Sequence, residues 1–174
     1  MTAADDRALE DLLERLRTRF YGKYRGIVTS VDSSTMRIKA KVPSVLGETD
    51  TAWCMPCVPY AGPKVGFAFL PEKGSGVWIE FEGGDVSYPL WVGCYWPQGE
   101  FPADAADDVK VIVTKAPHKV EFDDGQKSIT LSDPNGNTVT LDSSGITLAN
   151  GQSISVVISS SSVSVNDGAL EVQG

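Results

Sequence analysis

The feature that most constrains the fold is a repeat in the last third of the chain. The sequence there consists of short segments with two apolar residues at alternate positions, separated by turns rich in Gly, Asn, Asp and Ser. The first apolar residues of successive segments are 9, 10, 7, 8, 9 and 7 residues apart. The pairs are Val120/Phe122, Ile129/Leu131, Val139/Leu141, Ile146/Leu148, Ile154/Val156 (with Ile158), Val163/Val165 and Leu170/Val172. The alternation predicts short β-strands, and its recurrence predicts stacked units.

A single chain of such strands has too few apolar side chains in each layer to close a core, and it leaves long open edges. If three copies wrap around one axis, each layer receives side chains from all three, and each strand finds a neighbour in another chain. We therefore predict a homotrimeric β-prism, a triple-stranded β-helix, over residues 110–174. A disordered tail or an ordinary β-meander are the alternatives, and the regular alternation opposes disorder. The predicted core is Ile129, Leu131, Val139, Leu141, Ile146, Leu148, Ile154, Val156, Val163 and Val165.

Residues 23–101 have a different composition, with more aromatic residues and longer apolar segments. Five segments separated by Gly and Pro predict a small closed five-stranded barrel of the OB type. They are YRGIVTSVD, MRIKAKVPS, AWCMPCVPY, GVWIEFEGG and YPLWVGCYW. The stretch AGPKVGFAFLPEKGSG between the third and fourth is expected to be an extended loop. We expect four aromatic residues in the barrel core or in a barrel interface: Trp78, Phe81, Trp91 and Trp96.

Residues 1–22 are predicted to form an amphipathic helix. Apolar residues recur at spacings of three and four, namely Leu9, Leu12, Leu13, Leu16 and Phe20. We interpret them as contacts to a partner protein or within the trimer, although packing on the chain's own barrel is also open. Residues 102–109 are predicted to link the barrel to the repeat.

Charge argues against two classes of partner. The formal net charge is −8, whereas general affinity for nucleic acid needs a basic face. The same charge disfavours anchoring to an anionic membrane surface. The charged start MTAADDRALEDLL lacks the apolar segment of a secretory signal, so we expect assembly in the cytoplasm of the producing cell.

Few residues of the chain are suited to catalysis, redox activity or metal binding. Cys54 and Cys57 have redox spacing but lie in a predicted strand, where successive positions alternate between faces, so we expect reduced thiols. Zinc sites use four Cys or His ligands, and the chain has one His and three Cys. No nucleophile accompanies His118, for which we expect a buried or interchain hydrogen bond. We expect no catalytic residue, metal site, cofactor or enzymatic activity.

Three segments resemble the baseplate assembly protein V family of phage tails, which is similar to the spike portion of type VI secretion VgrG proteins. The most specific is PCVPYAGPKVGFAFLPEKGSGVWIEFEGGDVSYPLWVGCYW, residues 56–96. The second is KVIVTKAPHKVEFDD, with Pro117 where the family more often has Gly, and the third is SITLSDPNGNTVTLDSSGITL. The resemblance covers nearly the whole chain.

This resemblance implies a trimeric OB-fold collar and a β-helical needle, in the baseplate of a virion or injection particle. The collar would seat on the hub protein at its N-terminal side, among other baseplate proteins. The needle would contact the target membrane transiently as it leads the tube through the envelope. The end ALEVQG lacks the His-x-His iron site of some relatives, so a separate PAAR-type tip protein is expected. The alternative is an OB-fold nucleic-acid or carbohydrate binding module without a mechanical role.

Overall fold

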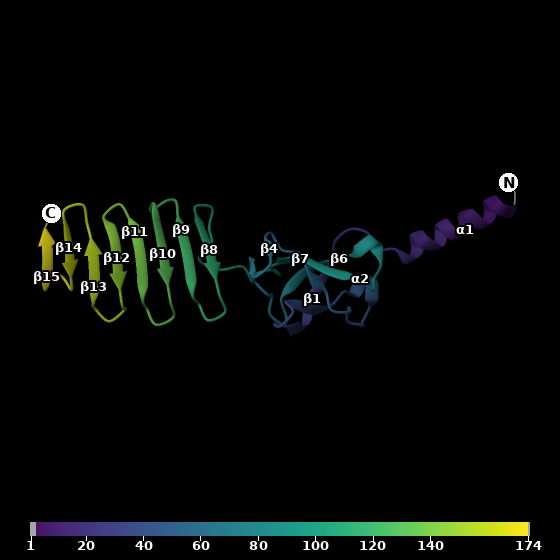
Figure 1. The fold of residues 1–174 in the computed structure, drawn as a ribbon, viewed down its shortest axis with the longest axis horizontal. Helices are drawn as coiled ribbons and strands as arrows, with labels where there is room; N and C mark the ends of the chain where they lie inside the picture. The colour runs from purple at the N-terminus through teal and green to yellow at the C-terminus, as the bar shows by residue number, and fades with distance from the viewer. Residues whose placement is uncertain (1–2, 174) are drawn as a thin grey trace. The chain divides into compact units, whose positions relative to one another are not determined.

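The computed structural model is mainly β and divides into two units, residues 1–100 and 101–174 (Figure 1). It describes the backbone of residues 3–173 and the side chains of these residues except 3–6, 15, 16 and 171. Within the described residues, no helix is both long enough and apolar enough to cross a membrane.

The first unit begins with helix α1 (Ala3–Thr18), as the leucine spacing predicts. A five-stranded sheet follows, in the order β2-β1-β6-β7-β3. Its strands are β1 (Tyr24–Asp32), β2 (Arg37–Lys41), β3 (Met55–Pro56), β6 (Gly76–Phe81) and β7 (Pro89–Tyr95). All five correspond to the predicted segments, but β3 is only two residues long and pairs in parallel with β7.

Single bridges complete the curl of this sheet. Cys54, just before β3, bridges Ile38 of β2, and Asp50 bridges Lys41. These bridges join the two outer strands of the sheet order, as an OB-type barrel requires. Thr51 lies between the bridges and is buried, and its Oγ1 accepts a hydrogen bond of 3.0 Å from the Ala40 amide.

The barrel has a core of its own. Alternate residues of the strands point inward, and the core residues are at most 5% exposed. They are Val28, Ile38, Ala40, Val42, Cys54, Val77, Ile79, Phe81 and Trp91.

Short elements fill the barrel connections. The sequence did not lead us to expect the one-turn helix α2 (Pro43–Leu46), which begins with a proline, as first turns tolerate. The expected extended loop before β6 contains a small hairpin of β4 (Ala61–Gly62) and β5 (Val65–Gly66). A 3-10 turn, η1 (Glu82–Gly84), follows β6.

The second unit is one antiparallel sheet of eight strands, in chain order from β8 to β15. The strands are β8 (Val109–Val113), β9 (Lys119–Asp123), β10 (Ser128–Ser132), β11 (Thr138–Asp142), β12 (Gly145–Ala149), β13 (Ser155–Ile158), β14 (Ser162–Val165) and β15 (Leu170–Gln173). They lie side by side along the unit (Figure 1).

This pairing corrects one expectation. We expected each strand to find a neighbour in another chain, but each strand from β8 to β14 pairs with the next strand of its own chain. Short turns favour this arrangement because they return the chain directly alongside the strand just completed. Strand β8 was not among the predicted strands, because the sequence repeat begins with the segment that forms β9.

The predicted linker, residues 102–109, is tied to the start of this sheet. Lys119 Nζ lies 2.9 Å from Asp104 Oδ2 and 2.9 Å from Glu121 Oε2. The Asp124 amide donates to the Asp108 carbonyl at 2.8 Å. This segment therefore belongs structurally to the second unit.

Candidate functional site

The candidate site is one face of the C-terminal sheet, which we call the apolar face. Residues directly opposite one another on paired strands lie on the same face of a sheet. The register places Val120, Leu131, Val139, Leu148, Val156, Val165 and Leu170 in one continuous row. A second row contains Phe122, Ile129, Leu141, Ile146, Ile158, Val163 and Val172.

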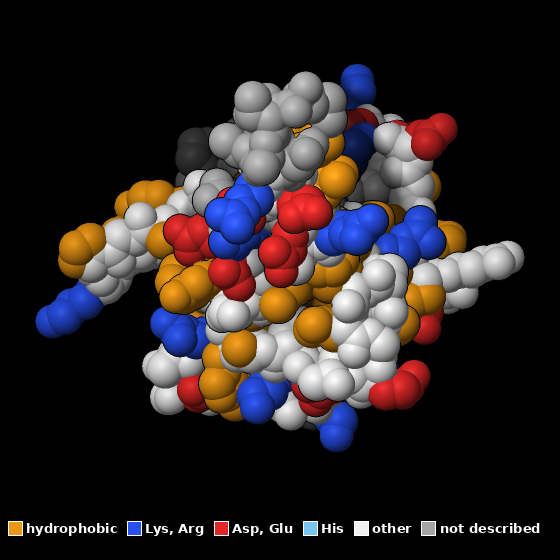
Figure 2. Space-filling model, turned by 90° about the vertical axis from the view of Figure 1, so that its right-hand side faces the viewer, with side chains coloured by type: hydrophobic (Ala, Val, Ile, Leu, Met, Phe, Trp, Pro, Cys, Tyr) orange, Lys and Arg blue, Asp and Glu red, His pale blue; other side chains and the backbone are white. Residues whose placement is uncertain are grey.

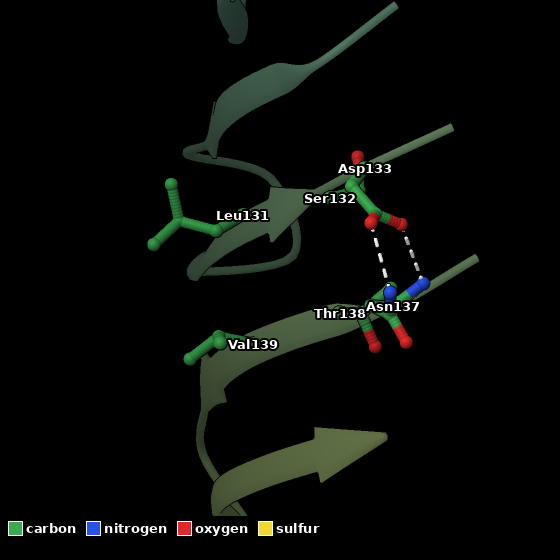
Figure 3. A pocket seen from close by; sticks show the side chains of 6 residues that line it. All are labelled: Leu131, Ser132, Asp133, Asn137, Thr138 and Val139. Carbon is green, nitrogen blue, oxygen red and sulfur yellow. Dashed lines mark hydrogen bonds between the residues drawn. The ribbon is translucent and has the colours of Figure 1, made fainter. Parts of the chain in front are cut away.

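Figure 3 shows how two strands contribute to this face. Leu131 of β10 and Val139 of β11 point the same way from neighbouring strands, at one end of a shallow hollow. Asp133 and Asn137 lie at the other end, where hydrogen bonds join them. The apolar side chains and the polar turn therefore occupy separate parts of the hairpin.

The apolar face remains open to solvent in the single chain. Ten side chains of the two rows are 38–62% exposed: Phe122, Ile129, Leu131, Leu141, Ile146, Leu148, Ile158, Val163, Leu170 and Val172. Every regular element in the described part of this unit is a strand of the one sheet, so no second layer from the unit covers the face. An apolar surface that continues over seven strands, from β9 to β15, marks an interaction site.

The opposite face is polar over most of its length. From β10 to β14 it carries mainly Ser and Thr, including Ser128, Thr130, Thr138, Thr140, Thr147 and Ser164, whereas β8 contributes valines to it. Small hydroxyl side chains suit solvated strands that must stay narrow. The two faces of the sheet thus differ in polarity, and the register of the strands determines which residues lie on the apolar face.

The turns hold the register in place. Asp133 accepts hydrogen bonds of 2.9 Å from the amides of Asn135 and Asn137 and from the side chains of both residues at 2.8–2.9 Å. These bonds, the Asn137 side chain first among them, lower the pKa of Asp133 from 3.8 to about 2. At Gly145, with φ +135°, an added Cβ would clash with the Ile158 carbonyl oxygen, so β12 and β13 approach each other closely there.

Most predicted core residues of the repeat lie on this face. Ile154 differs, because it precedes β13 and is 54% exposed in the turn. Ile158, which we treated as secondary, instead pairs with Ile146 and Val163. Strand β8 contributes Ile112, opposite Val120, and the sequence analysis did not include it.

The predicted helix contacts separate into two groups. Leu9, Leu12 and Leu13 are exposed on α1. Phe20 lies beyond the helix end and packs on its own barrel, with its ring centroid 6.4 Å from that of Phe81. The side chain of Leu16 lies outside the described residues.

The four predicted barrel aromatics occupy three environments. Phe81 and Trp91 lie in the core, at 5% and 4% exposure. Trp78 is half-buried, with Arg25 Cζ 5.6 Å from its ring centroid. Trp96 is exposed at 69%.

The groups considered for chemistry are dispersed. Cys54 is buried, which raises the pKa of its thiol, and Cys57 is exposed. His118 is exposed rather than buried, and its amide donates to Thr114 Oγ1 at 3.2 Å. Among the described side chains, no three His, Cys, Asp or Glu residues gather in a metal-binding arrangement. On the face seen in Figure 2, acidic and basic side chains are interspersed and do not form a continuous basic surface.

Comparison with known families assigns both units. Residues 24–96 match the type VI secretion system/phage-baseplate injector OB domain. Residues 110–171 match the phage baseplate V C-terminal trimerisation domain, which spans nearly all of the sheet that carries the apolar face. No curated protein matches the chain.

The trimerisation match is consistent with the open apolar face, because a surface that packs against other copies is exposed in the single chain. The two matches follow each other along the chain, with the OB domain first. Both matched domains are components of injector or phage baseplates, and the C-terminal match supports a homotrimer. The chain belongs to the baseplate V/VgrG-like family of phage and type VI injector proteins.

Proposed function

We propose that the homotrimer is the central spike of a contractile tail baseplate, and that its C-terminal sheet forms a needle that punctures the target envelope when the sheath contracts. One observation carries the proposal: the two apolar rows run without interruption across the sheet from β9 to β15. Three such faces turned inward around one axis make a long, narrow rod with a continuous core.

The geometry suits a rod under axial load. Neighbouring strands are about 4.8 Å apart, so the eight strands extend the sheet by about 34 Å. Force along this direction passes from strand to strand through the ladder hydrogen bonds. Freeing one strand also exposes apolar side chains of all three copies, which makes unfolding slow.

The exterior suits passage through an envelope. With the apolar faces inward, the Ser and Thr face is outward, and the chain carries a net charge of −8. Such a surface adheres weakly to anionic lipid and to nucleic acid. Membrane contact would therefore be transient.

The remaining partners follow from the same role. We propose that the collar seats on a hub protein at its N-terminal side, among other baseplate proteins, after assembly in the producing cell's cytoplasm. The needle would carry a separate PAAR-type tip at its C-terminal end. Co-purification of a small Cys- and His-rich protein with this chain would support the tip, whereas a needle that closes to a point by itself contradicts it.

A particle experiment tests puncture separately from assembly. Val163 lies on the apolar face of β14, and Ser164 lies next to it on the opposite face. Val163→Ala weakens the proposed shared core without placing a charge in it, so particles carrying it should assemble and contract but release less dye than the wild type from target-envelope vesicles. Particles carrying Ser164→Ala should release dye like the wild type. Full dye release by assembled Val163→Ala particles would contradict the puncturing role.

A further inference from the structure

Helix α1 carries a second apolar surface without a partner in the single chain. Leu9, Leu12 and Leu13 are 47%, 55% and 43% exposed. Together with the sequence position of Leu16, they form a stripe at spacings i, i+3, i+4 and i+7. A stripe of this width is typical of a helix in a bundle, and is wider than a two-stranded coiled-coil seam.

The helix needs a partner for its own stability. Isolated helices shorter than about 12–15 residues are marginal in water, and most helical stability comes from packing of an apolar face. Helix α1 has 16 residues, close to this limit, and its described leucines remain exposed. Whatever covers them therefore also stabilises the helix.

The connection to the barrel is short and tied. Only residues 19–23 separate α1 from β1. Arg19 Nη1 forms an ion pair of 2.9 Å with Asp85 Oδ2, and the Phe20 amide donates to the Gly84 carbonyl at 2.8 Å. The C-terminal end of each helix is therefore held at a fixed point on its own barrel.

The trimer supplies the partner. In a threefold assembly, three tied connections place three identical helices around one axis and in the same direction. Tethering to one assembly raises their effective concentration to the millimolar range, on the order of 10⁻³ M. We propose that the three α1 helices of one trimer pack together as a parallel three-helix bundle, with Leu9, Leu12 and Leu13 at its interface. The proposal rests on the homotrimer and is independent of the puncturing role.

Disulfide trapping in the full-length trimer tests the bundle. The exposed Cys57 and Cys94 are first replaced by serine, which leaves the buried Cys54. Leu12→Cys is then compared with Asp11→Cys, whose position lies on the far side of the helix. Each protein is oxidised with oxidised glutathione and run on a non-reducing denaturing gel.

We expect Leu12→Cys to form disulfide-linked dimers about fivefold more than Asp11→Cys, at a yield that does not change on dilution, because linking occurs within one trimer. Equal linking at the two positions, or linking that falls on dilution, would overturn the bundle. Absence of linking at both would also overturn it and would assign the leucines to another protein, such as a hub.

A second measurement tests the bundle without the cysteine variants, in case these misfold locally. The double substitution Leu9→Asn/Leu13→Asn should lower the helical circular dichroism signal at 222 nm while the mass remains that of a trimer. The control Arg7→Asn/Asp11→Asn should keep the signal. An unchanged signal in the leucine variant would show that α1 does not depend on bundling, and the proposal would fail.

Discussion

The barrel and the C-terminal sheet deal with their apolar residues in opposite ways. The barrel's nine core residues are at most 5% exposed within one chain. The exposed large apolar side chains on the open face of the sheet are 38–62% exposed. The barrel therefore contains the apolar packing that it needs, whereas the sheet leaves an apolar face open, as expected of a trimerisation domain. Stability of the sheet should vary with protein concentration, and that of the barrel should not.

The largest expected effect is loss of the trimer in Leu131→Asp. Each copy would place an unpaired charge in the shared core, at a cost of about 3 kcal/mol or more per chain. Light scattering should show the mass falling toward the 18.6 kDa of one chain. All four tryptophans lie between residues 53 and 96, so native tryptophan fluorescence would show that the barrel stays folded.

The matched control is Thr130→Asp, one residue away on the polar face. It should remain a trimer. If both variants dissociate, or neither does, the assignment of the apolar face to the shared core is wrong.

The next effect is confined to the barrel. Ile79 is fully buried, and Ile79→Ala should lower the free energy of unfolding of the barrel by about 2–5 kcal/mol. The tryptophan-detected denaturation midpoint should fall equally at high and low protein concentration. Ile27→Ala, at a site 39% exposed, should have a smaller effect. A concentration-dependent shift would show that the barrel core also relies on other copies.

Thr51→Val should lower the free energy of unfolding of the barrel by a smaller amount. The substitution removes the hydroxyl that accepts from the Ala40 amide and leaves that amide unpaired. The free energy of unfolding, measured by chemical denaturation, should fall by about 1–3 kcal/mol. Thr51→Ser keeps the acceptor and should retain most of the stability, and an equal loss in both variants would assign the effect to packing.

The smallest effect concerns pH. Because the pKa of Asp133 is lowered to about 2 in the fold, its contribution to stability is present above pH 3.8 and is lost as the pH falls toward 2. Asn137→Ala should raise the pKa of Asp133 back toward 3.8, as measured by NMR titration of the carboxyl group. Asn150→Ala, in another turn, should leave this pKa unchanged.

Much of both units could be predicted from alternation and turns. The mainly β fold, the five barrel strands and the repeat from β9 onward follow from such patterns. The third barrel segment gives only a short strand, since Pro56 and Pro59 have no amide hydrogen to donate. Helix α2 was not predicted because a single turn leaves no periodicity to detect.

Two features of the site could not be predicted in the same way. Strand β8 is joined to β9 by TKAPH, which lacks the Gly and Asn that mark the other turns. The choice of Ile158 over Ile154 depends on where β13 begins, and alternation alone places both on the same face. Pairing partners were also misjudged, because the need for three copies to form a core does not require strands to pair between chains.

The short turns of the sheet have a consequence for its length. Strands β10, β12 and β14 begin at Ser128, Gly145 and Ser162, which are 17 residues apart. Each 17-residue block contains one complete hairpin and returns the chain to the same edge with the same face inward. Duplication or loss of a block would alter the reach of the rod in steps of two strands without shifting its register. A single in-frame event of one block is therefore enough to change the length of the sheet by about 10 Å.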